Sequence, residues 1–331
     1  MSIYSELRPR VKTANSTRKM RTEIPRVPEE LWQAGLHQPL NHILQSEGKR
    51  LRAELVELSY HLAGGTGALP GQLIEFVELL HAGSLVIDDI EDGSEVRRGR
   101  PTLHKMVGTP LAINTGNWMY FSAMEKLTEL PLEPLPLGKI MQETVTTIRR
   151  CHEGQALDLA ACVIDLDVTA IYPTAEAISN LKTGGLTALA AKLGAAVAGG
   201  SPELQACFHS FGMQLGIGLQ MQNDLAELNS AATALGRSDD FRNARVTWPW
   251  AWASQLRSET EVKHLQELLA QSTSENFQEV ALALTTSISN QRDTSIRTMI
   301  NGAVSCLKET LPSNSLNGLN EFMSRIEGYY V

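Results

Sequence analysis

The chain of 331 residues is poor in aromatic side chains, which make up 5% of it, although 43% of its residues are hydrophobic. Ala and Leu dominate and runs of β-branched residues are scarce, a balance that favours helices over sheets. The 4 cysteines are widely spaced and match neither a zinc-ligand nor a redox pattern. We therefore expect reduced thiols in a cytoplasmic protein.

Long apolar runs and an excess of positive charge are also missing. The Ala-rich stretch 187–200 is too short to cross a membrane and is interrupted by Lys192, so no transmembrane segment is expected. The net charge of −8 disfavours a broad surface for nucleic acid. A phosphate-containing ligand would have to be bound by local groups of basic residues.

Helical spacing of apolar residues, punctuated by Pro and Gly, begins near Pro28 and continues to the end of the chain. It predicts helices over 28–48, 51–63, 70–92, 110–130, 137–161, 174–198, 202–228, 246–256, 258–272, 275–310 and 316–328. Residues 1–27 are polar and basic, and we expect a loosely ordered arm there. The sequence predicts a single all-α domain over residues 28–331.

A group of carboxylates, Asp88-Asp89-Ile90-Glu91-Asp92, follows apolar residues at the end of the third predicted helix. Asp88 and Asp92 are four residues apart and share one helix face, with Asp89 alongside. Mg²⁺ accepts one or two protein carboxylates and completes its shell with water and substrate phosphates. A solvated, charged helix end is the alternative; the preceding apolar residues favour the metal site.

Basic residues accompany this motif. Arg97 and Arg98 follow it, and guanidinium groups bind phosphate through paired hydrogen bonds. The earlier segment 48–52 contains Lys49, Arg50 and Arg52 where a helix begins, a position at which cations oppose the helix dipole unless an anion compensates. An anion site is favoured slightly over a solvated helix start.

A third motif, Lys182-Thr183-Gly184-Gly185, interrupts a helix made mostly of Leu and Ala. Each mid-helix glycine costs about 1 kcal/mol relative to Ala. A kink that brings Lys182 to a ligand would explain this cost, and close helix packing explains it equally well. On the preceding helix, Gln155 and Asp158 share a side and could orient a water molecule or a lysine.

A second acidic motif lies on a later apolar helix, where Gln220 precedes Asn223, Asp224 and Glu227. Asn223 and Glu227 share a face, with Asp224 adjacent. With two carboxylates this is a weaker metal site than the first, and a polar helix end is an even alternative. Two acidic clusters that face each other across a helical bundle would bind a diphosphate through magnesium.

From about residue 40 to 255 the sequence resembles the trans-isoprenyl diphosphate synthases. Asp88-Asp-Ile-Glu-Asp92 with the following Arg-Arg-Gly-x-Pro resembles the first aspartate-rich motif of that family, and the other motifs occur in the family's order. The likeness is greatest to short-chain enzymes of the geranylgeranyl type. The resemblance implies an all-α helical bundle of the isoprenoid synthase type with a central substrate cavity, and a homodimer.

The resemblance also implies a role for individual residues. Isopentenyl diphosphate would be bound by Lys49, Arg52, His81 and Arg98. The allylic diphosphate would be contacted by Arg97, Lys182, Thr183 and Gln220, with Arg237 and Arg245 as further basic residues. Magnesium would be held by Asp88, Asp89, Asp92 and Asp224, and more weakly by Asn223 and Glu227. The catalytic set would be Asp88, Asp92, Arg97 and Lys182.

The implied reaction is the magnesium-dependent head-to-tail condensation of isopentenyl diphosphate with an allylic diphosphate. Small residues one turn before the acidic motif, Gly83 and Ser84, favour a deep pocket and a C20 product, geranylgeranyl diphosphate, over farnesyl diphosphate. Asn223 stands where most members have aspartate, which predicts weaker metal binding on that side. The alternatives are a terpene-synthase-like enzyme of the same fold and a non-catalytic partner subunit of another prenyl synthase.

Overall fold

The computed structural model describes residues 27–45, 48, 50–232, 238–271, 273–288, 292–312 and 315–328. The chain divides into two compact units, and each is described by itself. Unit 1 comprises Met1–Arg50 and Glu75–Lys126, and unit 2 comprises Leu51–Ile74 and Leu127–Val331. The arm expected at 1–27 lies almost wholly outside the described residues, and the single domain stays a prediction.

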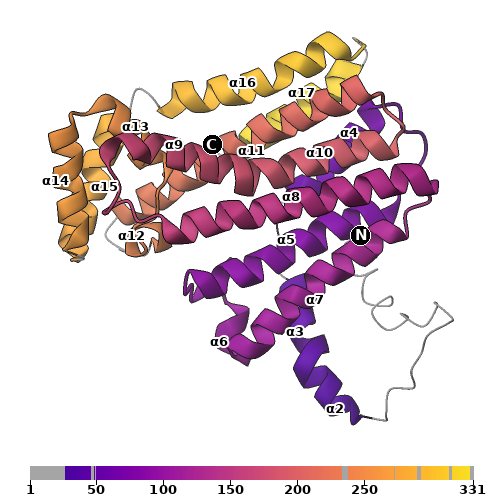
Figure 1. The fold of residues 1–331 in the computed structure, drawn as a ribbon, viewed down its shortest axis with the longest axis horizontal. Coiled ribbons are helices and arrows are strands. Elements are labelled where there is room, and N and C mark those ends of the chain that lie inside the picture. The colour runs from indigo at the N-terminus through magenta and orange to yellow at the C-terminus, as the bar shows by residue number, and fades with distance from the viewer. Residues whose placement is uncertain are drawn as a thin grey trace. The chain divides into compact units, whose positions relative to one another are not determined.

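Unit 1 is built on two long helices, α5 and α7, which lie side by side in Figure 1. Its elements are α2 (Glu29–Trp32), η1 (Gln33–His37), α3 (Gln38–Leu44), α5 (Gly71–Glu91) from Glu75 onward, β1 (Val96–Arg97), β2 (Arg100–Pro101), α6 (Leu103–Val107) and α7 (Thr109–Thr128). Val86 of α5, Leu103 of α6 and Ala112 of α7 form a buried apolar cluster that holds these helices together.

Glycines allow α5 and α7 to approach closely. A Cβ added to Gly83 would lie 3.0 Å from the Gly116 carbonyl oxygen and 3.1 Å from Met119 Cβ. A Cβ added to Gly116 would lie 2.8 Å from Ile87 Cδ1. Gly83 therefore serves helix packing, and the expectation that its small size deepens a pocket is wrong for this residue. Ser84 is partly exposed, and its effect on pocket depth stays a prediction.

A short β-hairpin departs from the purely helical expectation. Val96 pairs with Pro101 and Arg97 with Arg100, and the two residues between, Arg98 and Gly99, both have positive φ, 52° and 72°. This backbone is that of a two-residue hairpin turn with left-handed central residues, usually formed by Asn-Gly or Asp-Gly. An Arg-Gly pair gives no such signal, which is why the sequence did not predict it.

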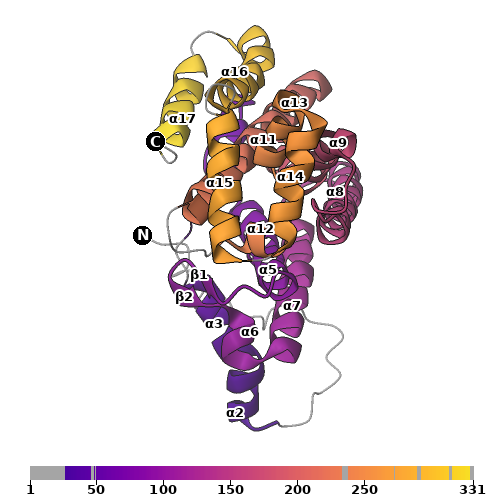
Figure 2. The same ribbon diagram turned by 90° about the vertical axis from the view of Figure 1, so that its left-hand side faces the viewer.

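His42 fixes this hairpin to α3, beside which both strands lie in Figure 2. Arg100 Nη2 lies 3.2 Å from His42 Nδ1, and His42 Nε2 lies 3.1 Å from the Pro101 carbonyl oxygen. Both ring nitrogens are used when Nδ1 accepts from the guanidinium and Nε2 donates to the carbonyl.

All regular secondary structure in the described residues of unit 2 is helical. The helices are α4 (Leu51–Leu62), α8 (Pro134–Ala160), α9 (Val168–Ser179), η2 (Asn180–Gly184), α10 (Gly185–Val197), α11 (Pro202–Ala232), α12 (Asp239–Arg242), α13 (Trp248–Leu256), α14 (Glu259–Ala270), α15 (Ser274–Ile288), α16 (Arg292–Thr310) and α17 (Leu316–Gly328). In the described parts of both units helices dominate, so the all-α prediction is confirmed.

The centre of unit 2 is α10, which packs against α4, α8 and α11 and runs alongside α8 and α11 in Figure 1. Small residues make this possible, since a Cβ on Gly212 of α11 would lie 2.6 Å from the Thr187 carbonyl oxygen of α10. A helix buried on most sides needs apolar residues all round, as the Leu- and Ala-rich sequence of α10 supplies.

Three further observations bear on the sequence predictions. Helix α9 begins at Val168, before the predicted start at residue 174, and passes through Pro173. Cys207 of α11 and Cys306 of α16 form a disulfide, so the prediction of reduced thiols is wrong for this pair, while Cys151 and Cys162 are free. Among the described helices, none is long and apolar enough to span a membrane.

Candidate active site

The first acidic motif ends α5 in a defined geometry. The Asp92 N–H donates to the Asp88 carbonyl at 2.9 Å, so Asp92 continues the helix and keeps the face of Asp88. Gly93 then adopts a positive φ of 66°, and Ser94 N–H reaches back to the Asp89 carbonyl at 3.0 Å. This is the Schellman arrangement of a helix C-terminus. It leaves both Asp88 and Asp92 partly exposed at the helix end.

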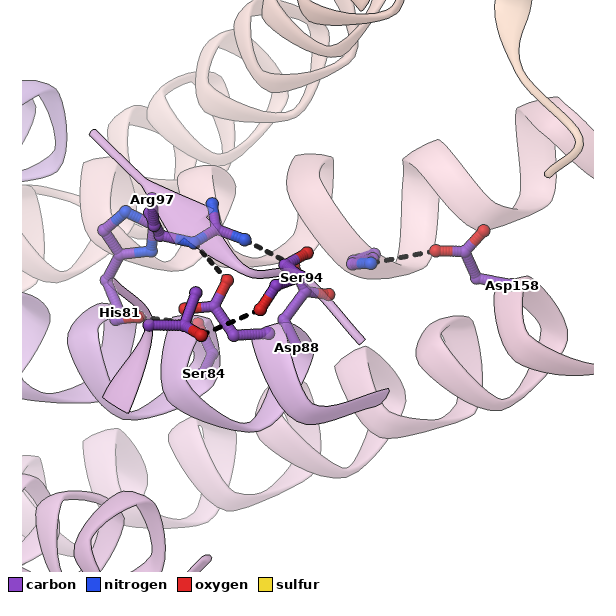
Figure 3. A network of polar contacts seen from close by, with 9 residues as sticks. His81, Ser84, Asp88, Ser94, Arg97 and Asp158 are labelled. Carbon is purple, nitrogen blue, oxygen red and sulfur yellow. Dashed lines mark hydrogen bonds and ion pairs between the residues drawn. The ribbon is translucent and has the colours of Figure 1, made fainter. Parts of the chain in front are cut away.

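The middle carboxylate, Asp89, is turned inward. Its side chain is 5% exposed and lies 2.5 Å from Arg97 Nε, whereas Arg97 Nη2 lies 3.5 Å from Asp88, whose side chain is 22% exposed (Figure 3). Burial raises the pKa of Asp89 to about 6, and the Arg97 guanidinium opposes that rise. The three aspartates thus differ: Asp89 forms a buried ion pair, and the other two remain accessible.

Of the four residues predicted to bind isopentenyl diphosphate, the structure describes three, and two of these lie in unit 1. A Cβ on Gly48 would lie 2.7 Å from Arg98 Nη1, so the Arg98 guanidinium packs against Gly48 within unit 1. His81 is partly exposed on α5, seven residues before Asp88 and therefore on the same helix face. Lys49 lies outside the described residues, and Arg52 belongs to unit 2.

In unit 2 the Lys-Thr-Gly motif forms a π-helical turn, η2, between α9 and α10. The neighbouring α8 approaches it closely, because a Cβ on Gly154 would lie 2.9 Å from the Lys182 backbone nitrogen. One turn after Gly154, Asp158 accepts from Lys182 Nζ at 2.9 Å (Figure 3). The motif therefore combines an irregular turn with close packing, and the expectation that Asp158 orients a lysine is confirmed.

Further predicted contacts to the allylic diphosphate in unit 2 are hydrogen-bonded to one another or to Asp158. Thr183 Oγ1 donates to Gln220 Oε1 at 2.6 Å, and Gln220 Nε2 donates to Asp224 Oδ1 at 2.7 Å. Arg245, which is buried, donates from Nη1 to the Asp158 carbonyl at 2.7 Å. Unit 2 thus brings Lys182, Thr183, Gln220, Asp224 and Arg245 together. Arg237 lies outside the described residues.

The second acidic motif differs from the first in exposure. Asp224 is 6% exposed, and both its oxygens accept hydrogen bonds, Oδ1 from Gln220 and Oδ2 from the Trp248 N–H at 2.9 Å. Burial raises the pKa of Asp224, and the hydrogen bonds from Trp248 and Gln220 lower it. Asn223 is exposed and Glu227 partly exposed. Within the described ranges no group of three or more His, Cys, Asp or Glu side chains is arranged to hold a metal ion.

Two residues of this network were not predicted from the sequence. Trp248 binds Asp224 through its backbone and donates from Nε1 to Ser179 Oγ at 2.8 Å. Both are nearly fully buried. Neither stands out in the sequence, because a tryptophan and a serine in apolar helices are ordinary core residues, and the only signal is the Trp-Pro pair that starts α13.

Comparison with known proteins agrees with these motifs. The polyprenyl synthetase family model matches residues 33–285. The geranylgeranyl diphosphate synthase of Methanosarcina mazei is 32% identical over 66% of this chain and 66% of its own. The short chain isoprenyl diphosphate synthase of Methanothermobacter thermautotrophicus is 31% identical over 73% of this chain and 72% of its own length. The fold is similar to that of geranylgeranyl pyrophosphate synthase from Corynebacterium glutamicum, at TM-score 0.72, 22% identity and coverage of 88% and 89%; that crystal structure contains isoprenyl diphosphate and magnesium.

The family match over most of the chain, the helical fold and the order of the motifs define the class. The protein belongs to the polyprenyl synthetase family. Within that family it is a prenyltransferase of the short-chain isoprenyl diphosphate synthase type, as its relatives indicate.

Proposed function

We propose that the protein catalyses the magnesium-dependent condensation of isopentenyl diphosphate with an allylic diphosphate and that its product is geranylgeranyl diphosphate. The observation that carries this proposal is the cluster of Lys182, Thr183, Gln220 and Arg245 in unit 2. The first acidic motif with its arginine pair adds to it in unit 1. These are the residues that the family resemblance assigns to the diphosphates.

The donor set of the first motif suits magnesium. Asp88 and Asp92 share a helix face, are partly exposed, and have the hard oxygen ligands that Mg²⁺ prefers. Two protein carboxylates are sufficient, because water and substrate phosphate complete the octahedral shell. The ion would neutralise charge that develops on the departing diphosphate. Asp89, Asn223 and Glu227 stay predicted ligands. Asp224 was also predicted as a ligand, but because both of its oxygens accept hydrogen bonds, its role in this proposal is to hold Gln220 and Trp248 rather than the ion.

The chain's own cations would share that task. Lys182 and Arg97 carry positive charge that is partly compensated by Asp158 and by the acidic motif. Preorganised cations stabilise a leaving group without reorganisation at the moment of reaction. The allylic cation that remains would be attacked by the double bond of isopentenyl diphosphate, and the released diphosphate would then accept the proton that is lost. Thr183 and Gln220 would orient the allylic diphosphate through hydrogen bonds.

A product assay tests the proposal. Purified protein with Mg²⁺ and isopentenyl diphosphate is offered dimethylallyl, geranyl or farnesyl diphosphate, and products are identified by mass spectrometry. We expect geranylgeranyl diphosphate with each acceptor. A hydrocarbon or alcohol would instead indicate a terpene-synthase-like enzyme, and the absence of product with every acceptor would indicate a non-catalytic subunit. Farnesyl diphosphate as the end product would correct the chain length alone.

We also propose that the protein is a homodimer. On α7 of unit 1, Leu111, Trp118 and Phe121 share a helix face, and Phe121 is 77% exposed. Exposed apolar side chains that cluster on one face mark interaction surfaces, and a second copy is the partner that the family resemblance implies. Sedimentation should give a dimer for the wild type and for the control Met106→Asp, which changes an exposed residue of α6. Phe121→Asp should give a monomer; a dimeric Phe121→Asp would refute this surface.

A further inference from the structure

Trp248 and Ser179 extend a chain of hydrogen bonds in unit 2, and the backbone between Ser179 and Thr183 closes this chain into a ring. Thr183 donates to Gln220, Gln220 donates to Asp224, and Asp224 also accepts from the backbone N–H of Trp248. The indole of Trp248 then donates to Ser179, the residue directly before η2. Because η2 carries Thr183, the ring returns to the turn where it began.

The ring joins three segments that are far apart in the sequence and lies in the interior. Trp248 is 1% exposed, Ser179 3% and Asp224 6%. A buried donor or acceptor that loses its partner keeps its full desolvation cost, so each of these bonds constrains the groups on both sides. The helices that carry them, α9, α11 and α13, pack on one another, and α9 and α13 lie side by side in Figures 1 and 2.

The Trp248 end of the ring is fixed by its place in α13. Trp248 is the first residue of that helix, where the backbone N–H has no partner within the helix, and Asp224 supplies the acceptor. The indole of Trp248 packs edge-to-face on the phenol of Tyr172 in α9, and the centroids of the two aromatic rings are 5.7 Å apart. The indole therefore has little freedom to turn away from Ser179.

We propose that Trp248 and Ser179 are positioning residues, which act through Asp224 and η2 to hold Gln220 and Thr183 in the orientation that binds the diphosphate of the allylic substrate. The proposal rests on the proposed function, which assigns that substrate to this network. Trp248 and Ser179 act through the ring and do not touch the substrate.

The test uses the full chain and the variants S179A, W248F and S179A/W248F. W252F is the matched control, because Trp252 is also buried on α13 and packs against Trp248 but lies outside the ring. For each variant, kcat and the KM of both substrates are measured, together with the melting temperature and the affinity for magnesium pyrophosphate by calorimetry.

Both single variants break the same bond, so we expect each to lower kcat/KM for the allylic substrate about tenfold. The KM for isopentenyl diphosphate should stay within about twofold of the wild type. The double variant should be no worse than W248F alone, and W252F should match the wild type. A purely structural role would move both KM values and the melting temperature together, without this split.

Unchanged allylic kinetics in S179A, or single effects that multiply in the double variant, would overturn the proposal. If W248F does not fold, S179A alone decides by the same split between the two substrates. If the wild type turns over no substrate, the proposed function fails. The affinity for magnesium pyrophosphate then tests whether Trp248 and Ser179 position the diphosphate-binding residues. Weaker binding in S179A but not in W252F supports this positioning role, and equal binding overturns it.

Discussion

The two acidic motifs look alike in sequence and are built differently. In the first, on α5, Asp88 and Asp92 remain partly exposed on one helix face while Asp89 is buried against Arg97. In the second, on α11, the exposed position is the neutral Asn223, and the carboxylate of Asp224 is buried with both oxygens hydrogen-bonded. The first motif leaves two carboxylates accessible, whereas the second uses its aspartate to hold neighbouring segments together.

The largest effect on turnover is expected at the first motif, where a predicted metal ligand can be compared with a carboxylate that is not predicted to bind metal. Asp88→Ala should reduce turnover by at least about a hundredfold, because it removes a ligand of the Mg²⁺ ion whose positive charge would stabilise the leaving diphosphate. The control Glu91→Ala changes an exposed carboxylate in the same motif and should keep turnover within about twofold. Initial rates at saturating Mg²⁺ measure both. Comparable losses would mean that overall acidity matters rather than the face shared by Asp88 and Asp92.

The second prediction concerns the buried aspartate of the first motif and its titration. Its pKa is raised from 3.8 to about 6, so the folded state binds more protons than the unfolded state between these values. Stability therefore falls as pH rises through this window, by at most about 3 kcal/mol. Asp89→Asn should remove this slope in urea unfolding with EDTA between pH 3.8 and 6. A slope equal to that of the wild type would show that Asp89 is not the group responsible.

The third prediction compares stability at the two motifs. Asp224→Ala leaves the Trp248 N–H and the Gln220 amide without their acceptor, which should cost about 2 kcal/mol of unfolding free energy. Asp88→Ala should change stability by less than about 0.5 kcal/mol, because Asp88 is partly exposed. Urea denaturation at pH 7 gives both values. Equal losses would remove the distinction between a ligand site and a scaffold.

The smallest effect is expected at the departure from the family pattern. Asn223→Asp adds a third carboxylate to an exposed position of α11, so turnover should stay equal or rise by up to about fivefold. The rate is best compared at limiting Mg²⁺, where stronger metal binding has most effect. A fall in turnover would mean that the neutral side chain has a function of its own.

The sequence predicted helix boundaries well where glycine or proline lies directly at the end or the start of a helix. Gly64-Gly65 and Pro70 mark the end of α4 and the start of α5, and both boundaries were placed correctly. Pro173 misled the prediction for α9, which starts earlier because Val168 and Ile171 are buried and their packing outweighs the hydrogen bond lost at proline. Local signals cannot show such tertiary compensation.

The same limit applies to the candidate site. Charged and glycine-rich motifs predicted which residues would carry chemistry, and unit 2 brings Lys182, Thr183, Gln220 and Asp224 together as expected. The Trp248–Ser179 bond joins residues 69 apart that carry no charge, and no spacing rule connects them. Likewise, Gly83 was interpreted as an opening for substrate, but only the approach of α7 shows that it serves packing.

The difference between the motifs is tested most directly by the Mg²⁺ concentration that gives half-maximal rate in Asp92→Asn and Asp224→Asn. Asp92→Asn should raise this concentration about tenfold, because a ligand carboxylate is lost. Asp224→Asn should leave it within about twofold while kcat falls, because the side chain acts through Gln220 and Trp248. An increase in Asp224→Asn as large as in Asp92→Asn would contradict the account and make Asp224 a metal ligand.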